Sequence, residues 1–293
     1  MRFDNGHSPR AAPTSLEPSV PSPPLTADDN GRRSVISNRG SLLRRLVSWQ
    51  RRTCLNPYWL DSRHLDASIA RLAPFASGTL FDVGVGERPY ESVFAPHVSR
   101  YFGLEYPPVV FGNLNPELEH DSSPVRGLID IWADGQCLPL ADACVDTVLS
   151  LEVLEHLPKP EHCVAEMARV LRPGGRLLLT VPFLQPLHQL PFDFRRYTPR
   201  GLAELVEENG LEVEILEPRG NVATAAGATL SQWMLRHLAA KQRKHDGSIR
   251  MSRWRGPLVT PLIALTQLTF AGLERLVTDD ALCLGWTLVA RKR

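Results

Sequence analysis

The sequence predicts an α/β fold, a doubly wound parallel sheet with helices on both faces, and two observations lead to this prediction. Short apolar segments alternate with helical segments through the middle of the 293-residue chain. Residues 176–181 are almost continuously apolar, as expected for a parallel strand that is covered on both faces. We expect strands near residues 79–83, 100–105, 128–133, 145–151, 176–181 and 211–217. Ligands of such sheets bind at the carboxyl ends of the strands, so functional residues are expected in the loops that follow them.

Two helices carry clear start and stop signals. Pro160 begins the first, and the run Arg172-Pro173-Gly174-Gly175 ends it and turns the chain. Thr198-Pro199 supplies a cap and a first-turn proline for the second helix, and Asn209-Gly210 ends it. The sequence therefore predicts one helix before and one helix after the strand at residues 176–181.

Composition divides the chain into five parts. Residues 1–40 are rich in Pro, Ser, Asn and Arg without hydrophobic periodicity, so we expect a disordered tail. Residues 41–78 form a basic helical lead-in, 79–221 the core, 222–281 a helical insert, and 282–293 a final strand with a basic tail. The five cysteines form no Cys-x-x-Cys pair, and the N-terminus lacks the composition of a signal or transit peptide. We therefore expect a cytoplasmic location, no disulfide framework and no metal site.

Charge is unevenly distributed although the net charge is +1. Residues 80–220 hold 22 acidic and 11 basic residues, whereas the rest of the chain holds 10 acidic and 22 basic residues. Residues 235–255 alone carry seven basic residues, opposed only by Asp246. Such a pattern is typical of a solvated surface, or of a surface that meets an anionic membrane or polymer.

An apolar stretch in the insert raises the same question. Residues 256–273 include no charged side chain, and their number borders on that of a membrane span. If residues 283–290 return to the sheet, however, both ends of the insert lie on one side of any bilayer. The alternatives are a buried lid or homodimer helix, a monotopic anchor at the inner face of the membrane, and a true span. An anionic membrane would be contacted through residues 41–52 and 235–273.

A glycine-rich turn follows the first predicted strand, in the form Asp82-x-Gly84-x-Gly86. Glycine lacks a Cβ, so the backbone can turn sharply here and approach a nucleotide-like ligand. Glu105 lies 21 residues after Gly84, at the end of the second strand, where its carboxylate can accept from both hydroxyls of a ribose.

The order of these motifs resembles the class I S-adenosylmethionine-dependent methyltransferases, in the group related to ubiquinone/menaquinone-type enzymes. The resemblance covers roughly residues 61–221 and 282–292. It rests on the glycine turn, Glu105, Ala133-Asp134 with Leu138-Pro139-Leu140, the run from Asp146 through Glu155-His156-Leu157, the hairpin Leu171-Arg-Pro-Gly-Gly-Arg-Leu, and the closing Gly-Trp-Thr-Leu-Val-Ala-Arg.

This resemblance implies a Rossmann-like sheet of seven strands, mostly parallel, with the last strand antiparallel and a helical insert before it. It also implies S-adenosyl-L-methionine as the cofactor. The positions that would hold the cofactor are Asp82, Gly84, Gly86, Glu105, Asp134, Leu151 and Glu152, and the resemblance places Asp134 at the adenine amino group.

A polar and aromatic loop at residues 181–198 should overhang the edge of the sheet where the methyl group points. Similar methyltransferases, often linked with glycans or other cell-surface products, show a comparable His…Asp-Phe/Tyr-x-Arg-Tyr-Thr run. We expect His188 to accept a proton and assign it to the catalytic group with Asp193 and Tyr197; Arg195, Arg196 and His156 are expected to bind the acceptor. In the alternative interpretation the charged residues only pin the loop, His188 is solvated, and His156 packs against the loop.

The function expected from these features is methyl transfer, with O-methylation expected, to a small-molecule, lipid-linked or glycan acceptor. Such a displacement needs no metal, because positioning and desolvation can supply much of its rate. A nicotinamide-dinucleotide oxidoreductase is the main alternative, although Pro89 replaces the third glycine of its fingerprint. A non-catalytic module with this fold is a second alternative. Nucleic acid is not expected as a partner, because the core is acidic.

Overall fold

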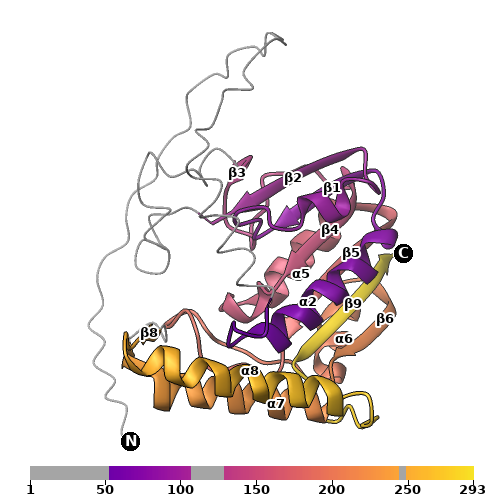
Figure 1. Cartoon of the computed structure of the whole chain (residues 1–293). Helices are drawn as coiled ribbons and strands as arrows, with labels where there is room; N and C mark the ends of the chain where they lie inside the picture. The colour runs from indigo at the N-terminus through magenta and orange to yellow at the C-terminus, as the bar shows by residue number, and fades with distance from the viewer. Residues whose placement is uncertain (1–52, 107–128, 244–248) are drawn as a thin grey trace, which may run out of the picture. The chain divides into compact units, whose positions relative to one another are not determined.

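The computed structural model describes residues 53–106, 129–243 and 249–293, which all lie within one compact unit, Leu43–Arg293 (Figure 1). The predicted tail at residues 1–40 and the basic segment at 41–52 fall outside the described residues. The membrane role expected for residues 41–52 therefore stays a prediction.

A seven-stranded sheet forms the centre of the described part, in the order β3-β2-β1-β4-β5-β9-β6. All neighbouring pairs are parallel except those of β9, which runs antiparallel to both β5 and β6. This confirms the predicted fold class. The strands are β1 (Thr79–Val83), β2 (Arg100–Glu105), β3 (Ile131–Trp132), β4 (Val145–Leu151), β5 (Leu171–Pro182), β6 (Leu211–Arg219) and β9 (Gly285–Lys292).

Two strands differ in length from the prediction. β3 has only two residues, compared with the six expected at 128–133. β5 begins at Leu171 rather than at Arg176, because Leu171 already pairs with Val145 before the register shifts and Arg176 pairs with Thr147. The turn at Pro173-Gly174 therefore bulges within the strand instead of preceding it.

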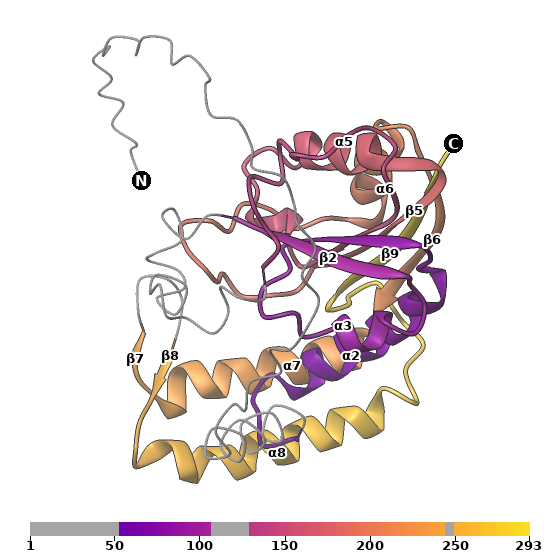
Figure 2. The same ribbon diagram turned by 90° about the horizontal axis from the view of Figure 1, so that it is seen from above.

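Helices cover both faces of the sheet (Figure 2). One face carries α5 (Pro160–Val170) and α6 (Pro199–Glu207); the other carries α2 (Trp59–Leu72) and the short α3 (Glu91–Phe94). Side chains of β5 alternate accordingly: Leu177 and Leu179 pack into the cluster of α5 and α6, and Leu178 into that of α2. The predicted cap of α6 is present, since the Thr198 hydroxyl accepts from the Gly201 N–H at 3.2 Å.

The insert between β6 and β9 is only partly helical. It consists of α7 (Val222–Met234), the π-helical turn η4 (Leu235–Ala239), the strand pair β7 (Ala240–Arg243) and β8 (Ile249–Met251), and α8 (Arg255–Leu273). The predicted helical insert before the last strand is present in α7 and α8, and it also contains the strand pair β7 and β8. These strands pair antiparallel with each other and not with the main sheet, and their short polar sequences carry no clear alternation.

Helices α7 and α8 run side by side in both views (Figures 1 and 2). Their contact is close, because a Cβ on Gly227 would lie 2.4 Å from the Cβ of Phe270. The buried Gln267 side chain joins α8 to the start of α2: its oxygen accepts from the Leu60 N–H at 3.1 Å, and its nitrogen donates to the carbonyls of Cys54 and Asn56. The insert is therefore fixed to the core by packing and by buried hydrogen bonds.

Candidate active site

The glycine turn after β1 has the backbone conformation that its sequence predicts. Gly84 has φ +81° and Gly86 has φ +50°, values in the left-handed region that favours glycine. A Cβ on Gly84 would lie 2.5 Å from Val153, whereas a Cβ on Gly86 would meet nothing within 4 Å. The turn is thus packed against the segment after β4 at Gly84 and open at Gly86, which leaves room for a ligand over the backbone.

Glu105 ends β2 beside this turn. Its carboxylate accepts from the Gly86 N–H at 2.9 Å and from the Tyr106 N–H at 3.0 Å. Burial raises the pKa of Glu105, and the two N–H donors partly offset that effect. The carboxylate therefore lies at the open side of the turn, where it can exchange these backbone donors for ribose hydroxyls.

Asp82 lies in β1, two residues before Gly84. It is 5% exposed and accepts a hydrogen bond from the Tyr101 hydroxyl. Burial raises its pKa to about 7, against the lowering effect of the Tyr101 hydrogen bond. Asp82 is therefore joined to β2 through Tyr101, and its contact with the cofactor stays a prediction.

Asp134 follows β3, the third strand at this edge. Its carboxylate accepts from the backbone and side-chain nitrogens of Gln136, at 2.9 and 3.2 Å. Leu151 ends β4 on the other side of β1, and Glu152, which follows it, has φ +55°. The structure thus brings the seven predicted cofactor residues to the carboxyl ends of four adjacent strands, where the strand order reverses.

The residues at this edge fit S-adenosylmethionine. Space over Gly86 and the carboxylate of Glu105 suit a ribose, and Asp134 supplies an acceptor for an exocyclic amine. The Glu152 carboxylate is 3.0 Å from the Arg219 guanidinium and forms an ion pair with it. Its direct contact with the cofactor stays a prediction.

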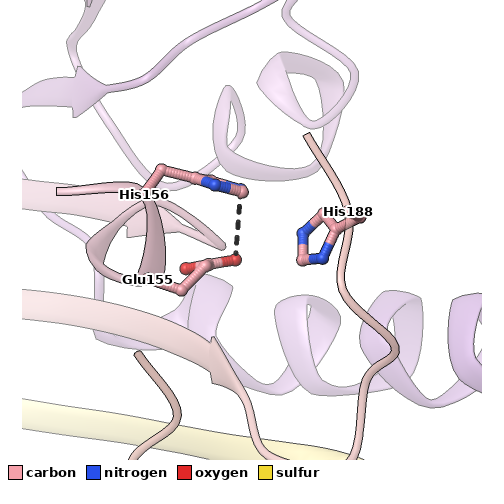
Figure 3. Close-up of side chains that lie close together, drawn as sticks. All are labelled: Glu155, His156 and His188. Carbon is pink, nitrogen blue, oxygen red and sulfur yellow. Dashed lines mark ion pairs between the residues drawn. The ribbon is translucent and has the colours of Figure 1, made fainter. Parts of the chain in front are cut away.

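A cluster of Glu155, His156 and His188 lies beyond the end of β4 (Figure 3). Glu155 and His156 belong to the 3₁₀ turn η3 (Leu154–His156), and His188 comes from the predicted acceptor loop. The two imidazole rings meet edge to face, with centroids 4.9 Å apart, and the His156 Nε2 is 3.6 Å from the Glu155 carboxylate. The structure therefore brings His156 and His188 together, and their roles in acceptor binding and catalysis stay predictions.

Hydrogen bonds determine which ring nitrogens are protonated. The His156 Nδ1 is 2.6 Å from the Phe192 carbonyl, and the His188 Nδ1 is 3.2 Å from the Pro186 carbonyl and 3.4 Å from Asp193. Carbonyl oxygens only accept, so both Nδ1 atoms are the donors and both Nε2 atoms keep a lone pair. Burial and the neighbouring His188 lower the pKa of His156, which favours its neutral form.

Glu155 is fully buried, and neither carboxylate oxygen has a hydrogen-bond partner among the described residues. Burial raises its pKa well above the ordinary value, and the nearby Glu152 raises it further. One donor atom from each member of the cluster lies within 4.8 Å of the others, a spacing that could hold a metal ion. The described residues bring no fourth His, Cys, Asp or Glu into the group, so three ligands are the most they offer.

The charged residues of the acceptor loop are engaged in holding it. Asp193 has a fully buried side chain that accepts from Arg196 at 2.5 and 2.9 Å and from the His188 N–H at 3.0 Å. Burial by itself would raise the pKa of Asp193, but these donors more than offset it and hold the pKa below the ordinary value. Arg195 donates to the carbonyls of Leu157 and Pro158. The loop is thus held in place by the hydrogen bonds of Asp193, Arg195 and Arg196.

Tyr197 also supports the loop. It is 8% exposed, and its hydroxyl donates to the Leu154 carbonyl at 3.1 Å. Of the three residues expected to be catalytic, only His188 is partly exposed, with 29% of its side chain accessible and none of the Asp193 side chain. The structure gives Asp193 and Tyr197 positioning roles, and their direct participation in the reaction stays a prediction.

Two further residues near the site, Arg219 and Asp61, were not predicted from the sequence. Arg219 is 1% exposed and donates to Glu152, and burial raises the pKa of Asp61 to about 6 although Arg219 lowers it. Neither residue belongs to a motif. A Cβ on Gly285 would lie 2.2 Å from the Arg219 guanidinium, so the glycine leaves space for this large side chain. The uncharged sequence around Gly285 was the only local sign of that space.

Known proteins are similar to parts of this chain. A family model described as "Methyltransferase domain" matches residues 81–179, from β1 into β5. An "Uncharacterized methyltransferase" of Mycobacterium avium (strain 104) is 39% identical over 105 residues, which span 36% of this chain and 40% of that relative. The chain thus matches about two fifths of that relative's length.

Two further proteins cover more of the chain. A Mycolicibacterium smegmatis protein named "Probable S-adenosylmethionine-dependent methyltransferase" is 30% identical over 189 residues, which span 61% of this chain and 67% of the relative. A solved S-adenosylmethionine dependent methyltransferase from Mesorhizobium loti has a TM-score of 0.45 and 13% identity, and covers 80% of this chain and 100% of its own. With the ordered glycine turn, Glu105 and Asp134 at one sheet edge, the chain belongs to the S-adenosylmethionine-dependent methyltransferases.

Proposed function

We propose that this methyltransferase transfers its methyl group to a hydroxyl oxygen of a small-molecule, lipid-linked or glycan acceptor, with His188 as the proton acceptor. The observation that carries the proposal is the state of the His188 ring. Its Nδ1 is held by the Pro186 carbonyl and faces Asp193, which leaves the Nε2 lone pair available beside Glu155 and His156.

A hydroxyl acceptor needs such a group more than a thiol or an amine does. The bound cofactor supplies an electrophilic methyl group on a sulfonium sulfur. In the displacement, the acceptor oxygen would take the methyl group from the sulfonium sulfur, and the His188 Nε2 would accept the hydroxyl proton. Asp193 then stabilises the imidazolium through its contact with Nδ1. The other residues of the cluster favour this transfer by excluding water, since Glu155 and His156 are buried or nearly so.

Cofactor binding is tested separately by calorimetry with S-adenosylhomocysteine on the full chain. Glu105→Ala should weaken binding about 10- to 100-fold, because charge-assisted hydrogen bonds are worth about 1.5–3 kcal/mol. Glu207→Ala, an exposed carboxylate on α6, is the matched control and should bind normally. Binding of a nicotinamide dinucleotide with no heat from S-adenosylhomocysteine would overturn the cofactor assignment and favour the oxidoreductase alternative.

The acceptor is sought by incubating the protein with methyl-labelled S-adenosylmethionine and an extract from a strain that lacks the gene. Label should enter a product that is absent from the deletion strain. His188→Ala should slow the transfer about 10²- to 10⁴-fold, the usual contribution of general base catalysis. His162→Ala, which removes an exposed histidine on α5, should leave the rate unchanged. Normal transfer by His188→Ala would show that the acceptor is not a hydroxyl activated by this residue.

A further inference from the structure

The exposed side chains of α8 are apolar except for Arg255 and Thr269. Ile263, Gln267 and Ala271, spaced by four residues, are buried against the rest of the insert and the start of α2. The opposite side exposes a stripe of large apolar side chains, each between 49 and 80% exposed, at Trp254, Leu258, Leu262, Leu265, Leu268 and Leu276. We call these six residues the α8 stripe. No charged side chain lies between Gly256 and Leu273, so the stripe is an exposed apolar surface without the polar residues that a solvated helix carries.

Basic residues surround the N-terminal end of this stripe. Lys241, Arg250, Arg253 and Arg255 are exposed on the β7–β8 pair and the start of α8. Within the described residues none of the four forms an ion pair. The Arg253 guanidinium lies over the Trp254 ring, 5.9 Å from the ring centroid, which is a cation–π contact. Asp246 is the only acidic residue between positions 218 and 273. This end of the insert therefore complements an anionic partner.

A pocket opens where the basic end meets the stripe. It has a volume of about 420 Å³ and is lined by Met251, Ser252, Arg253, Gly256, Pro257, Thr260 and Pro261. Its lining combines one cation and two hydroxyls with apolar side chains. A phosphate with an attached glycerol and acyl chain complements this lining, because the phosphate is anionic and the acyl chain is apolar.

We propose that the α8 stripe lies in the surface of an anionic phospholipid membrane, with a lipid headgroup phosphate in the pocket beside Arg253. Leucine and tryptophan side chains enter the boundary between headgroups and acyl chains, and the arginines remain at the level of the phosphates. The helix lies in the membrane plane, because Gln267 and the other buried residues hold its inner face to the core along its length. α8 is long and apolar enough to span a membrane, and 28% of its apolar stretch is buried, but spanning would break these contacts.

The test measures sedimentation of the full-length protein with vesicles, without any methyl acceptor, so it is independent of the proposed O-methylation. Binding should be strong to vesicles that contain phosphatidylglycerol, weaker to pure phosphatidylcholine, and reduced by salt. Leu258→Asp with Leu265→Asp should abolish binding. Arg253→Ala should weaken it about fivefold, since each basic residue near an anionic surface contributes about 1 kcal/mol.

Matched controls lie across the sheet from the insert. His162→Asp on α5 adds the same carboxylate, and Arg200→Ala on α6 removes an exposed arginine; both should bind vesicles as the unchanged protein does (Figure 2). Calorimetry with S-adenosylhomocysteine checks that the α8 variants still fold. Unchanged binding to phosphatidylglycerol vesicles by the Leu258 and Leu265 variant would overturn the proposal. A second result would also overturn it: the unchanged protein forms a dimer in light scattering and does not bind vesicles, and the Leu258 and Leu265 variant is a monomer. The α8 stripe would then be a contact between two copies.

Discussion

The guanidinium of Arg219 donates to the carboxylate of Glu152 at 3.0 Å and so joins the last residue of β6 to the residue that follows β4. The pair lies next to the glycine turn of the active site, because Glu152 is followed by Val153, which packs against Gly84. Gly285 leaves the room for it, since a Cβ there would lie 2.2 Å from the guanidinium. A buried cation in this position compensates the carboxylates of Glu152 and Asp61.

Arg219→Met should therefore destabilise the protein by about 3 kcal/mol, because it leaves carboxylates of this group without their cation. Urea unfolding, followed by circular dichroism, measures the change. Arg200→Met removes an exposed ion pair with Glu204 on α6 and should change the free energy of unfolding by less than about 0.5 kcal/mol. Equal effects of the two substitutions would contradict the assigned role of Arg219.

Asp82 should give the stability a specific pH dependence. Its pKa is raised from 3.8 to about 7, mainly by burial, so the folded state holds a proton that the unfolded chain has released. The free energy of unfolding should then fall between about pH 4 and pH 7, with a contribution of up to about 1.4 kcal/mol per pH unit, and level off above. Asp82→Asn keeps an acceptor for Tyr101 and should remove this contribution. Urea unfolding at several pH values compares the two proteins, and identical slopes would refute the prediction.

Tyr197→Phe separates positioning from catalysis in the acceptor loop. The substitution removes the hydrogen bond to the buried Leu154 carbonyl, so a loss of about 1 kcal/mol in the free energy of unfolding is expected. Rates of label transfer should stay within a few fold of the unchanged protein, in contrast to His188→Ala. A loss as large as that of His188→Ala, with normal stability, would restore Tyr197 to the catalytic group.

Gln267→Leu probes how the insert is fastened to the core. The change leaves the Leu60 N–H and the carbonyls of Cys54 and Asn56 without their bonds to Gln267, at a cost of about 2 kcal/mol in the free energy of unfolding. Gln242→Leu, on the exposed strand β7, is the matched control and should change it by less than about 0.5 kcal/mol. A similar small effect for both substitutions would mean that packing alone holds α8.

Much of the core was predictable because its signals are local. The strand β1, the glycines after it and the capped helix α6 each follow from residues within one short window, and the structure places them accordingly. The antiparallel β9 came from resemblance to known methyltransferases, because nothing in residues 285–292 states which strands they pair with.

The pairings of charged residues were beyond the sequence. From the sequence alone, Asp193 and Arg196 could have faced either an acceptor or each other. Only the fold shows that they form an ion pair. Glu152 and Arg219 are 67 residues apart, and no periodicity connects them. The α8 stripe was visible as an uncharged stretch, but which of its faces is exposed depends on the position of α7 and α2.

The position of β9 between β5 and β6 has a consequence for biosynthesis. β9 is the last described strand in chain order, yet it lies between β5 and β6 and pairs with both. While the ribosome is still translating the insert, β6 has no partner in the sheet, and the edge of β5 that later receives β9 is unpaired. The nascent chain therefore exposes the unpaired edges of β5 and β6 together with the apolar α8, a combination that favours association with other chains. Folding of this half of the sheet must await residues 285–292, so chaperones that hold the nascent chain during that interval should raise the yield of folded protein.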